Sequence, residues 1–280
     1  MVAVEHVENS QGLSPLSYDG LQKFVPLEIW DLVVDATADD LSTLKACATT
    51  CRAFLRRSRY HLFRRVTVRT GKFAEILIST LQRDPDIRSA VRELQLDSSN
   101  PVPDWVIQTV RALLPMLFNL RKLLLRSMQL SHPALPELLS IARHTVTSLD
   151  LTLCKFDSFA AFIRLVLALP CITDLALNFI SFGVAQPIVV ADADLQLLGM
   201  SGIMLSTLRL RCHPLGPWMG ALLRWLRNTP TLASLRKLHL RTAMCETAHD
   251  IQTLTCFAKD SALDTLVLDC GGTISLGGGV

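Results

Sequence analysis

The chain has 280 residues, of which 50% are hydrophobic and 19% charged, and its formal net charge is +3. So small a net charge is not typical of a nucleic-acid-binding protein, and the arginines between Arg52 and Arg69 are not interleaved with a platform of aromatic residues. The longest apolar stretch, residues 159–170, contains Arg164 and is too short to cross a bilayer, so we expect neither nucleic acid nor a membrane as a partner.

The N-terminal segment, residues 1–22, is predicted to be disordered. It lacks the basic start and apolar core of a secretory signal. The eight cysteines mostly fall within apolar patterns, where a free thiol packs as a small hydrophobe. We therefore expect free thiols rather than disulfides, in a protein of the cytoplasm, the nucleus or both.

Two short helices are predicted between Phe24 and Val68. Pro26 suits the first position of a helix, and the apolar residues Ile29, Leu32 and Val33 then recur at one face. Asp40 is a suitable N-cap for a second helix that continues to Leu55. The segment has more apolar residues than so short a helical unit can bury, which indicates that part of it forms an interface.

This segment resembles the F-box family in the run Pro-Leu-Glu-Ile at residue 26, in Asp40-Leu41, and in Cys51-Arg52 followed by the aromatic Phe54. The resemblance implies a helical module, residues 23–69, that docks onto the Skp-type adaptor of a cullin-RING ubiquitin ligase and reaches the cullin through that adaptor. The alternative is an ordinary buried helical hairpin. The positions that correspond to the family's contact residues are Pro26, Leu27, Ile29, Leu41, Leu44, Cys47, Cys51 and Phe54.

The rest of the chain repeats one phrase, an apolar residue, two variable residues and then Leu-x-Leu. Because Leu-x-Leu has the period of a strand, each phrase predicts a strand whose two leucines face one side. Helical patterns lie between the phrases, at residues 105–114, 135–142, 159–169, 218–226 and 251–258. The first leucines of the seven phrases are 26 to 33 residues apart and are Leu94, Leu123, Leu149, Leu175, Leu208, Leu238 and Leu266.

This spacing is similar to that of leucine-rich repeats. The resemblance implies an α/β fold: a solenoid over residues 70–280, with parallel strands on a concave face and helices outside. The family commonly has Asn or Cys three positions after the second leucine, and here only Cys154 matches. The residues after Leu268 contain neither an amphipathic helix nor a charged turn, so we expect a solenoid without a C-terminal cap and an exposed last strand.

The residues beside the leucines are expected to face a binding partner. On the fifth and sixth strands these residues are largely basic, and an acidic or phosphorylated target protein would suit them, because arginine offers paired donors to carboxylate and phosphate. The alternative is a solvated face that keeps the repeats soluble. The predicted target-binding residues are Arg209, Arg211, Lys237, His239 and Arg241.

No pattern in the chain predicts catalysis, a cofactor or a metal. There is no glycine-rich phosphate loop with its lysine, and Cys245 with His249, or Cys212 with His213, does not make a four-ligand zinc set. The sequence therefore predicts a substrate-recognition adaptor that performs no bond chemistry. The alternative is a repeat-based binding scaffold in which the helical module serves only as an N-terminal cap.

Overall fold

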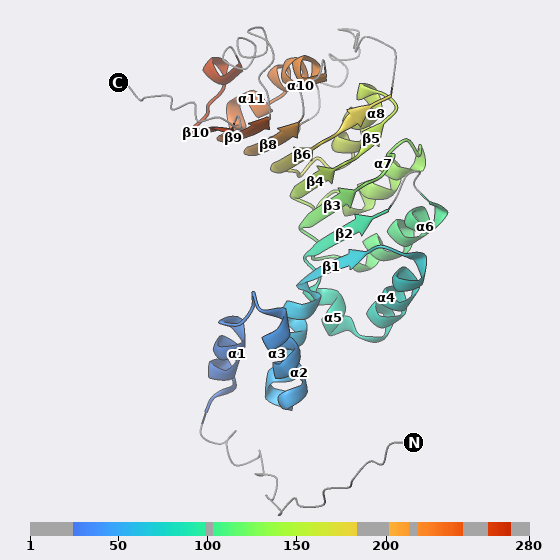
Figure 1. Cartoon of the computed structure of the whole chain (residues 1–280), viewed down its shortest axis with the longest axis vertical. Coiled ribbons are helices and arrows are strands. Elements are labelled where there is room, and N and C mark those ends of the chain that lie inside the picture. Colours follow the sequence, from blue (N-terminus) through green and yellow to red (C-terminus); the bar gives the residue numbers. More distant parts are fainter. Residues whose placement is uncertain (1–24, 99–102, 184–201, 213–217, 243–256, 270–280) are drawn as a thin grey trace, which may run out of the picture. The chain divides into compact units, whose positions relative to one another are not determined.

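The structure is a computed structural model that describes residues 25–98, 103–183, 202–212, 218–242 and 257–269 (Figure 1). The predicted disorder of residues 1–22 lies outside these ranges. The chain divides into two compact units, Met1–Leu62 and Phe63–Val280, and each is described by itself.

The described residues of the first unit form three helices: α1 (Leu27–Asp35), α2 (Leu41–Thr50) and α3 (Arg52–Arg64), whose last residues pass into the second unit. Pro26 caps α1 rather than opening it. Asp40 caps α2 as predicted, because its carboxylate accepts hydrogen bonds from the Ser42 and Thr43 amides at 2.9 and 3.2 Å.

The prediction of two helices was wrong, because the second one divides at Cys51. The Cys51 backbone is extended, with φ −156° and ψ 165°, and ends α2. The hydroxyls of Thr49 and Thr50 donate to the Ala46 carbonyl at 2.9 and 2.8 Å. Such back-bonding by β-branched residues weakens the last turn of a helix, which favours the break.

The second unit is an α/β structure built on one parallel sheet of eight strands in the order β1-β2-β3-β4-β6-β8-β9-β10. Each of the seven Leu-x-Leu phrases forms a strand, as predicted, and its leucines lie in register with those of the next. The strands are β1 (Arg65–Val68), β2 (Glu93–Asp97), β3 (Lys122–Arg126), β4 (Ser148–Thr152), β6 (Asp174–Asn178), β8 (Thr207–Cys212), β9 (Lys237–Thr242) and β10 (Thr265–Asp269).

Strand β1 was not predicted as part of the sheet. Its residues Arg65–Val68 pair with Glu93–Leu96 of β2, whereas the sequence analysis placed them in the helical module. The run Arg-Val-Thr-Val has the strand period but lacks the Leu-x-Leu phrase. The sheet therefore begins before residue 70.

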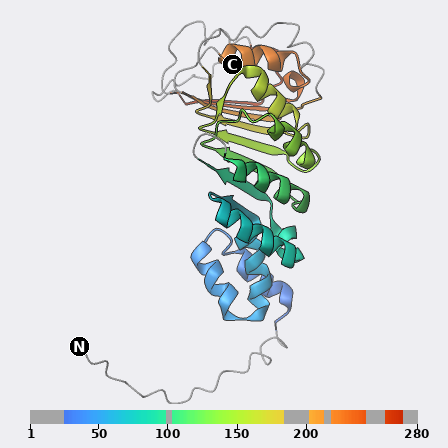
Figure 2. The ribbon, with the colours of Figure 1, turned by 90° about the vertical axis from the view of Figure 1, so that its right-hand side faces the viewer.

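The helices between the strands follow one another along one side of the sheet (Figures 1 and 2). The predicted helical segments match α6, α7, α8 and α10 closely, and of the segment 251–258 only the last two residues are described. α4 and α5 were not predicted. Among the described residues the helices with both ends defined are α4 (Gly71–Arg83), α5 (Pro85–Ala90), α6 (Asp104–Leu113), α7 (Ala134–Leu139), α8 (Phe159–Leu167), α10 (Trp218–Arg227) and α11 (Thr231–Ser234), with 3-10 turns η2 (Leu114–Met116) and η3 (Ser140–Ala142).

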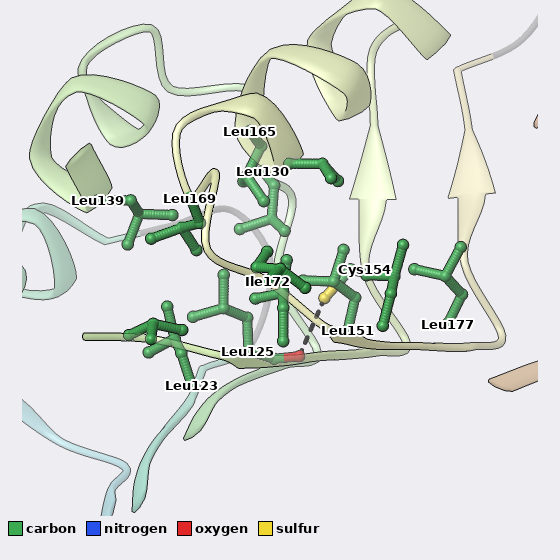
Figure 3. Packing of buried hydrophobic residues seen from close by; sticks show 14 of the residues in the cluster. Leu123, Leu125, Leu130, Leu139, Leu151, Cys154, Leu165, Leu169, Ile172 and Leu177 are labelled. Atoms are coloured by element: carbon green, nitrogen blue, oxygen red, sulfur yellow. Dashed lines mark hydrogen bonds between the residues drawn. The ribbon is translucent and has the colours of Figure 1, made fainter. Parts of the chain in front are cut away.

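The core of this unit lies between the sheet and these helices. Figure 3 shows the strand leucines clustered with helical residues such as Leu139 and Leu165. From β2 to β9 both leucines of every strand are buried, whereas Leu266 of β10 is 43% exposed. The opposite side of the sheet, formed by the residues that flank the leucines, is called the open face below.

A left-handed residue follows three of the strands: Ser127, Leu153 and Phe179 have φ of 56°, 55° and 53°. The amide of each of these residues donates a hydrogen bond to a carbonyl at the end of the next strand. Ser127 bonds to Thr152, Leu153 to Asn178 and Phe179 to Arg211, at 2.7 to 2.9 Å. The left-handed conformation is uncommon for residues other than glycine, so its recurrence marks a repeated turn.

Cys154, one residue after the second of these turns, holds the turn to the sheet. Its thiol donates to the Leu125 carbonyl at 3.2 Å (Figure 3). The equivalent Met128 and Ile180 are buried and cannot make this bond. The segments that follow Cys154 and Ile180 form a second, two-stranded sheet of β5 (Lys155–Phe156) and β7 (Ser181–Phe182). Beside it lies an aromatic cluster of Phe156, Phe159, Phe162, Phe182 and Trp218.

Candidate functional site

The helical unit leaves large apolar side chains in solvent. Of the residues of α1 only Val34 is buried. An amphipathic helix of a complete domain buries most of its apolar stripe, so this exposure is typical of a surface that another protein covers. We call this set, four residues around α1 and one at the start of α2, the apolar surface: Leu27 (50% exposed), Ile29 (46%), Leu32 (62%), Val33 (47%) and Leu41 (60%).

The predicted contact residues divide into three groups by exposure. Pro26, Leu27, Ile29 and Leu41 are exposed, whereas Cys47, Cys51 and Phe54 are half-buried. Leu44 is fully buried, with no exposed area, so it is a core residue of the helical unit and cannot contact a partner directly.

Leu32 and Val33 were not among the predicted contact residues, although they are exposed. Their positions three and four residues after Ile29 carried the signal, since residues at this spacing share one face of a helix. The apolar surface is therefore wider than the motif alone indicates.

Two contacts tie α1 to α3 and so hold the exposed apolar residues of α1 in place. The rings of Trp30 and Phe54 meet edge to face, 5.2 Å apart. Asp35 at the end of α1 accepts hydrogen bonds from the Arg57 Nε at 2.5 Å and from the nearly buried His61 Nε2 at 2.6 Å. The bonds to Arg57 and His61 lower the pKa of Asp35 to about 2, so the carboxylate stays charged at neutral pH.

The predicted target-binding residues lie together on the open face of β8 and β9. In the register of the two strands Arg209 is opposite His239, and Arg211 is opposite Arg241. Paired residues of neighbouring strands are about 4.8 Å apart, so these groups form one compact patch with Lys237. Arg209, Arg211, Lys237 and Arg241 are exposed and His239 is half-buried.

Two of the basic residues have partners that the sequence analysis did not assign. Arg241 forms an ion pair with Asp269 of β10 at 3.0 Å. The Arg211 guanidinium carbon lies over the ring of Phe179, 5.6 Å from its centroid, in a cation–π contact. The register of β9 and β10 places Asp269 beside Arg241, and the left-handed turn places Phe179 beside Arg211. Neither contact could be predicted from the composition of the chain.

Within the described ranges no group of three or more His, Cys, Asp or Glu residues could hold a metal ion. None of the helices there is long and apolar enough to span a membrane. The pair Cys245 and His249 lies outside the described residues. Burial raises the pKa of the Cys154 thiol to about 12, so it is neutral at physiological pH.

The features with the clearest potential for function are therefore two surfaces, one apolar and one basic. Comparison of the chain with models of known protein families gave no match, and neither did comparison with curated proteins.

Proposed function

We propose that this protein is a substrate-recognition adaptor of a cullin-RING ubiquitin ligase, acting in the cytoplasm or nucleus. In this proposal the helical unit is an F-box-like module that binds a Skp-type adaptor. The parallel sheet and its helices form a leucine-rich-repeat solenoid whose strand face binds the target. The protein would perform no bond chemistry, and the rate of ubiquitin transfer would come from proximity.

The observation that carries the proposal is the apolar surface of α1 and α2. It includes Leu27, Ile29 and Leu41, which are three of the positions that resemble F-box contact residues. Burying a side chain of this size contributes roughly 1.5 to 3 kcal/mol when it starts fully exposed, and about half of that at these exposures. Five such residues together contribute roughly 4 to 8 kcal/mol before the cost of association, which is a large part of what an interface needs.

The repeat regularity of the second unit supports the solenoid part of the proposal. Seven strands carry the same phrase, pair in parallel in the order of the chain, and have helices along one side. Repeats of this kind bury their leucines against their neighbours and leave the flanking residues available for binding.

The test is co-purification with a Skp-type adaptor after co-expression of the two full-length proteins. Ile29→Asp and Leu41→Asp should each reduce the adaptor recovered at least about tenfold, because a charge would replace a buried apolar contact. Ile141→Asp is the matched control: Ile141 is 47% exposed, as Ile29 is 46% exposed, but lies in η3 of the other unit.

Wild-type levels of adaptor in both variants would contradict the assigned docking surface. No recovery of the adaptor by the wild-type protein would favour the alternative, a repeat scaffold whose helical module is not an F-box. Leu44→Asp is not a useful variant. Leu44 is fully buried, so a charged side chain at this position would unfold the helical unit.

A further inference from the structure

On the open face from β1 to β3, four basic residues share two acids. Arg65 pairs with Glu93 at 2.8 Å, and Arg69 pairs with Asp97 at 3.7 Å. On β3, Lys122 and Arg126 lie opposite the same two acids in the register, one strand away. Each basic position of this part of the face therefore has a carboxylate beside it.

The polar groups in the middle of the open face bond one another. The Asn178 amide donates to the Asp150 carboxylate at 3.0 Å and to the Thr152 hydroxyl at 3.1 Å. The Thr152 hydroxyl in turn donates to Asp150 at 2.9 Å. These half-buried groups of β4 and β6 bond one another and leave little capacity for a ligand.

The patch on β8 and β9 differs from both. The register neighbours of Arg209 are Ala176 and His239, and those of Lys237 are Thr207 and Thr265. Among the described residues that neighbour the patch in the register, Asp269 is the one acid, and it pairs with Arg241. Among the described residues, the patch and its register neighbours thus have four arginine and lysine side chains to one acid, whereas the face from β1 to β3 has four to two.

We propose that four residues of this patch, Arg209, Arg211, Lys237 and His239, bind the phosphate group of a phosphoserine or phosphothreonine in a protein segment. The identification of that segment as part of a ubiquitination target rests on the proposed function. The binding chemistry does not rest on it.

The spacing of the patch favours phosphate over carboxylate. Residues two apart along a strand are about 6.6 Å apart and paired residues about 4.8 Å apart, so three long basic side chains can reach one anion together. A phosphate monoester offers three acceptor oxygens and up to two negative charges, whereas a carboxylate offers two oxygens and one charge. Arg211 is also partly ordered in advance, because its guanidinium lies over Phe179.

An extended protein segment suits the surroundings better than nucleic acid does. The open face toward the N-terminal side of the patch carries acidic groups, among them Asp150 and Asp174, and Asp174 lies opposite Thr207 of β8. A polyanion that follows the sheet would meet these carboxylates, whereas a segment with a single phosphate would not.

The test is binding of the full-length protein to peptide libraries of random flanking sequence with phosphoserine, serine or glutamate at the centre. We expect binding to the phosphoserine library and at least tenfold weaker binding to the other two. Raising the salt concentration from about 0.1 to 0.5 M should weaken the binding, because the patch is exposed. A single-stranded RNA of random sequence is the nucleic-acid probe.

Arg209→Gln combined with Arg211→Gln should lower phosphopeptide binding about tenfold to hundredfold, the usual effect of losing charge-assisted hydrogen bonds. Lys122→Gln combined with Arg126→Gln is the matched control, since these residues occupy the open face of β3 beside acids. It should bind as the wild type does. Lys237→Gln alone, with a smaller loss, keeps the test available if the double variant folds poorly.

Equal binding to the phosphoserine and glutamate libraries, preference for RNA, absence of binding to all probes, or equal losses in the control pair would each overturn the proposal. Adaptor co-purification from the same preparations separates the two proposals. Phosphopeptide binding without adaptor binding would contradict only the ligase function, and the reverse result would contradict only the phosphate site.

Discussion

Replacing Asp35 by asparagine should loosen α1 without touching the apolar surface. The variant keeps the shape of the side chain but removes the charge that Arg57 and His61 contact at 2.5 and 2.6 Å. The difference between a pKa of about 2 and the ordinary 3.8 corresponds to about 2.5 kcal/mol for a fully formed interaction. Because the Asp35 side chain is 31% exposed, solvent screening reduces this to about 1 kcal/mol.

Amide hydrogen exchange measures this loss, since it resolves α1 from the rest of the chain. A loss of about 1 kcal/mol should speed the exchange of the α1 amides about fivefold at pH 7. Asp39→Asn is the matched control, because Asp39 is exposed and has no ion pair among the described residues. Its exchange in α1 should equal that of the wild type.

The pH dependence of the same exchange gives a second test. A carboxyl with a lowered pKa stabilises the fold above its unfolded pKa of about 3.8 and loses that contribution as the pH falls through its folded pKa of about 2. Protection of α1, corrected for intrinsic exchange, should therefore be constant from pH 7 to about 4 and decline below that. If Asp35→Asn shows the same protection and the same decline as the wild type, the ion pair does not hold α1 to α3.

Three further predictions concern the sheet. Leu149→Ala in buried β4 should lower the free energy of unfolding by about 2.7 to 5 kcal/mol. Leu266→Ala, at the same phrase position but 43% exposed, should lower it by less than half as much. Chemical denaturation measures both losses, and equal losses would contradict the assigned burial. Cys154 should resist iodoacetamide at pH 8 in the native protein, while the exposed Cys171 reacts; mass spectrometry of the two peptides decides, and equal labelling would refute the burial of Cys154. Asn178→Ala should cost about 1 kcal/mol, because it removes two hydrogen bonds from half-buried acceptors, and an unchanged denaturation midpoint would show that water replaces them.

The regular part of the fold could be predicted because one local phrase repeats. Leu-x-Leu sets both the strand period and the buried side, so seven strands and the α/β class follow from positions such as Leu94 and Leu238. Arg65–Val68 was missed because a strand without the phrase depends on its neighbour β2 for its identity. Its pairing is a tertiary property that local sequence does not carry.

The candidate surfaces could be predicted in part. The basic residues of β8 and β9 were identified from their position beside the leucines, but the partner of Arg241 depends on how β9 and β10 align. The burial of Leu44 depends on which face of α2 meets the other two helices, and residues at helical spacing alone do not say which face that is. Exposure therefore had to come from the structure.

The order of the strands in the sheet, which is the order of the chain, affects how this unit folds. From β2 onward each strand pairs with one that lies 26 to 33 residues away, and the entropy of closing loops of such similar lengths hardly varies. Folding can thus start at any neighbouring pair and spread strand by strand, with contacts of uniformly short sequence separation. A strand damaged in the middle would loosen one side of the sheet more than the other, so hydrogen exchange should show local opening on that side before the whole unit unfolds.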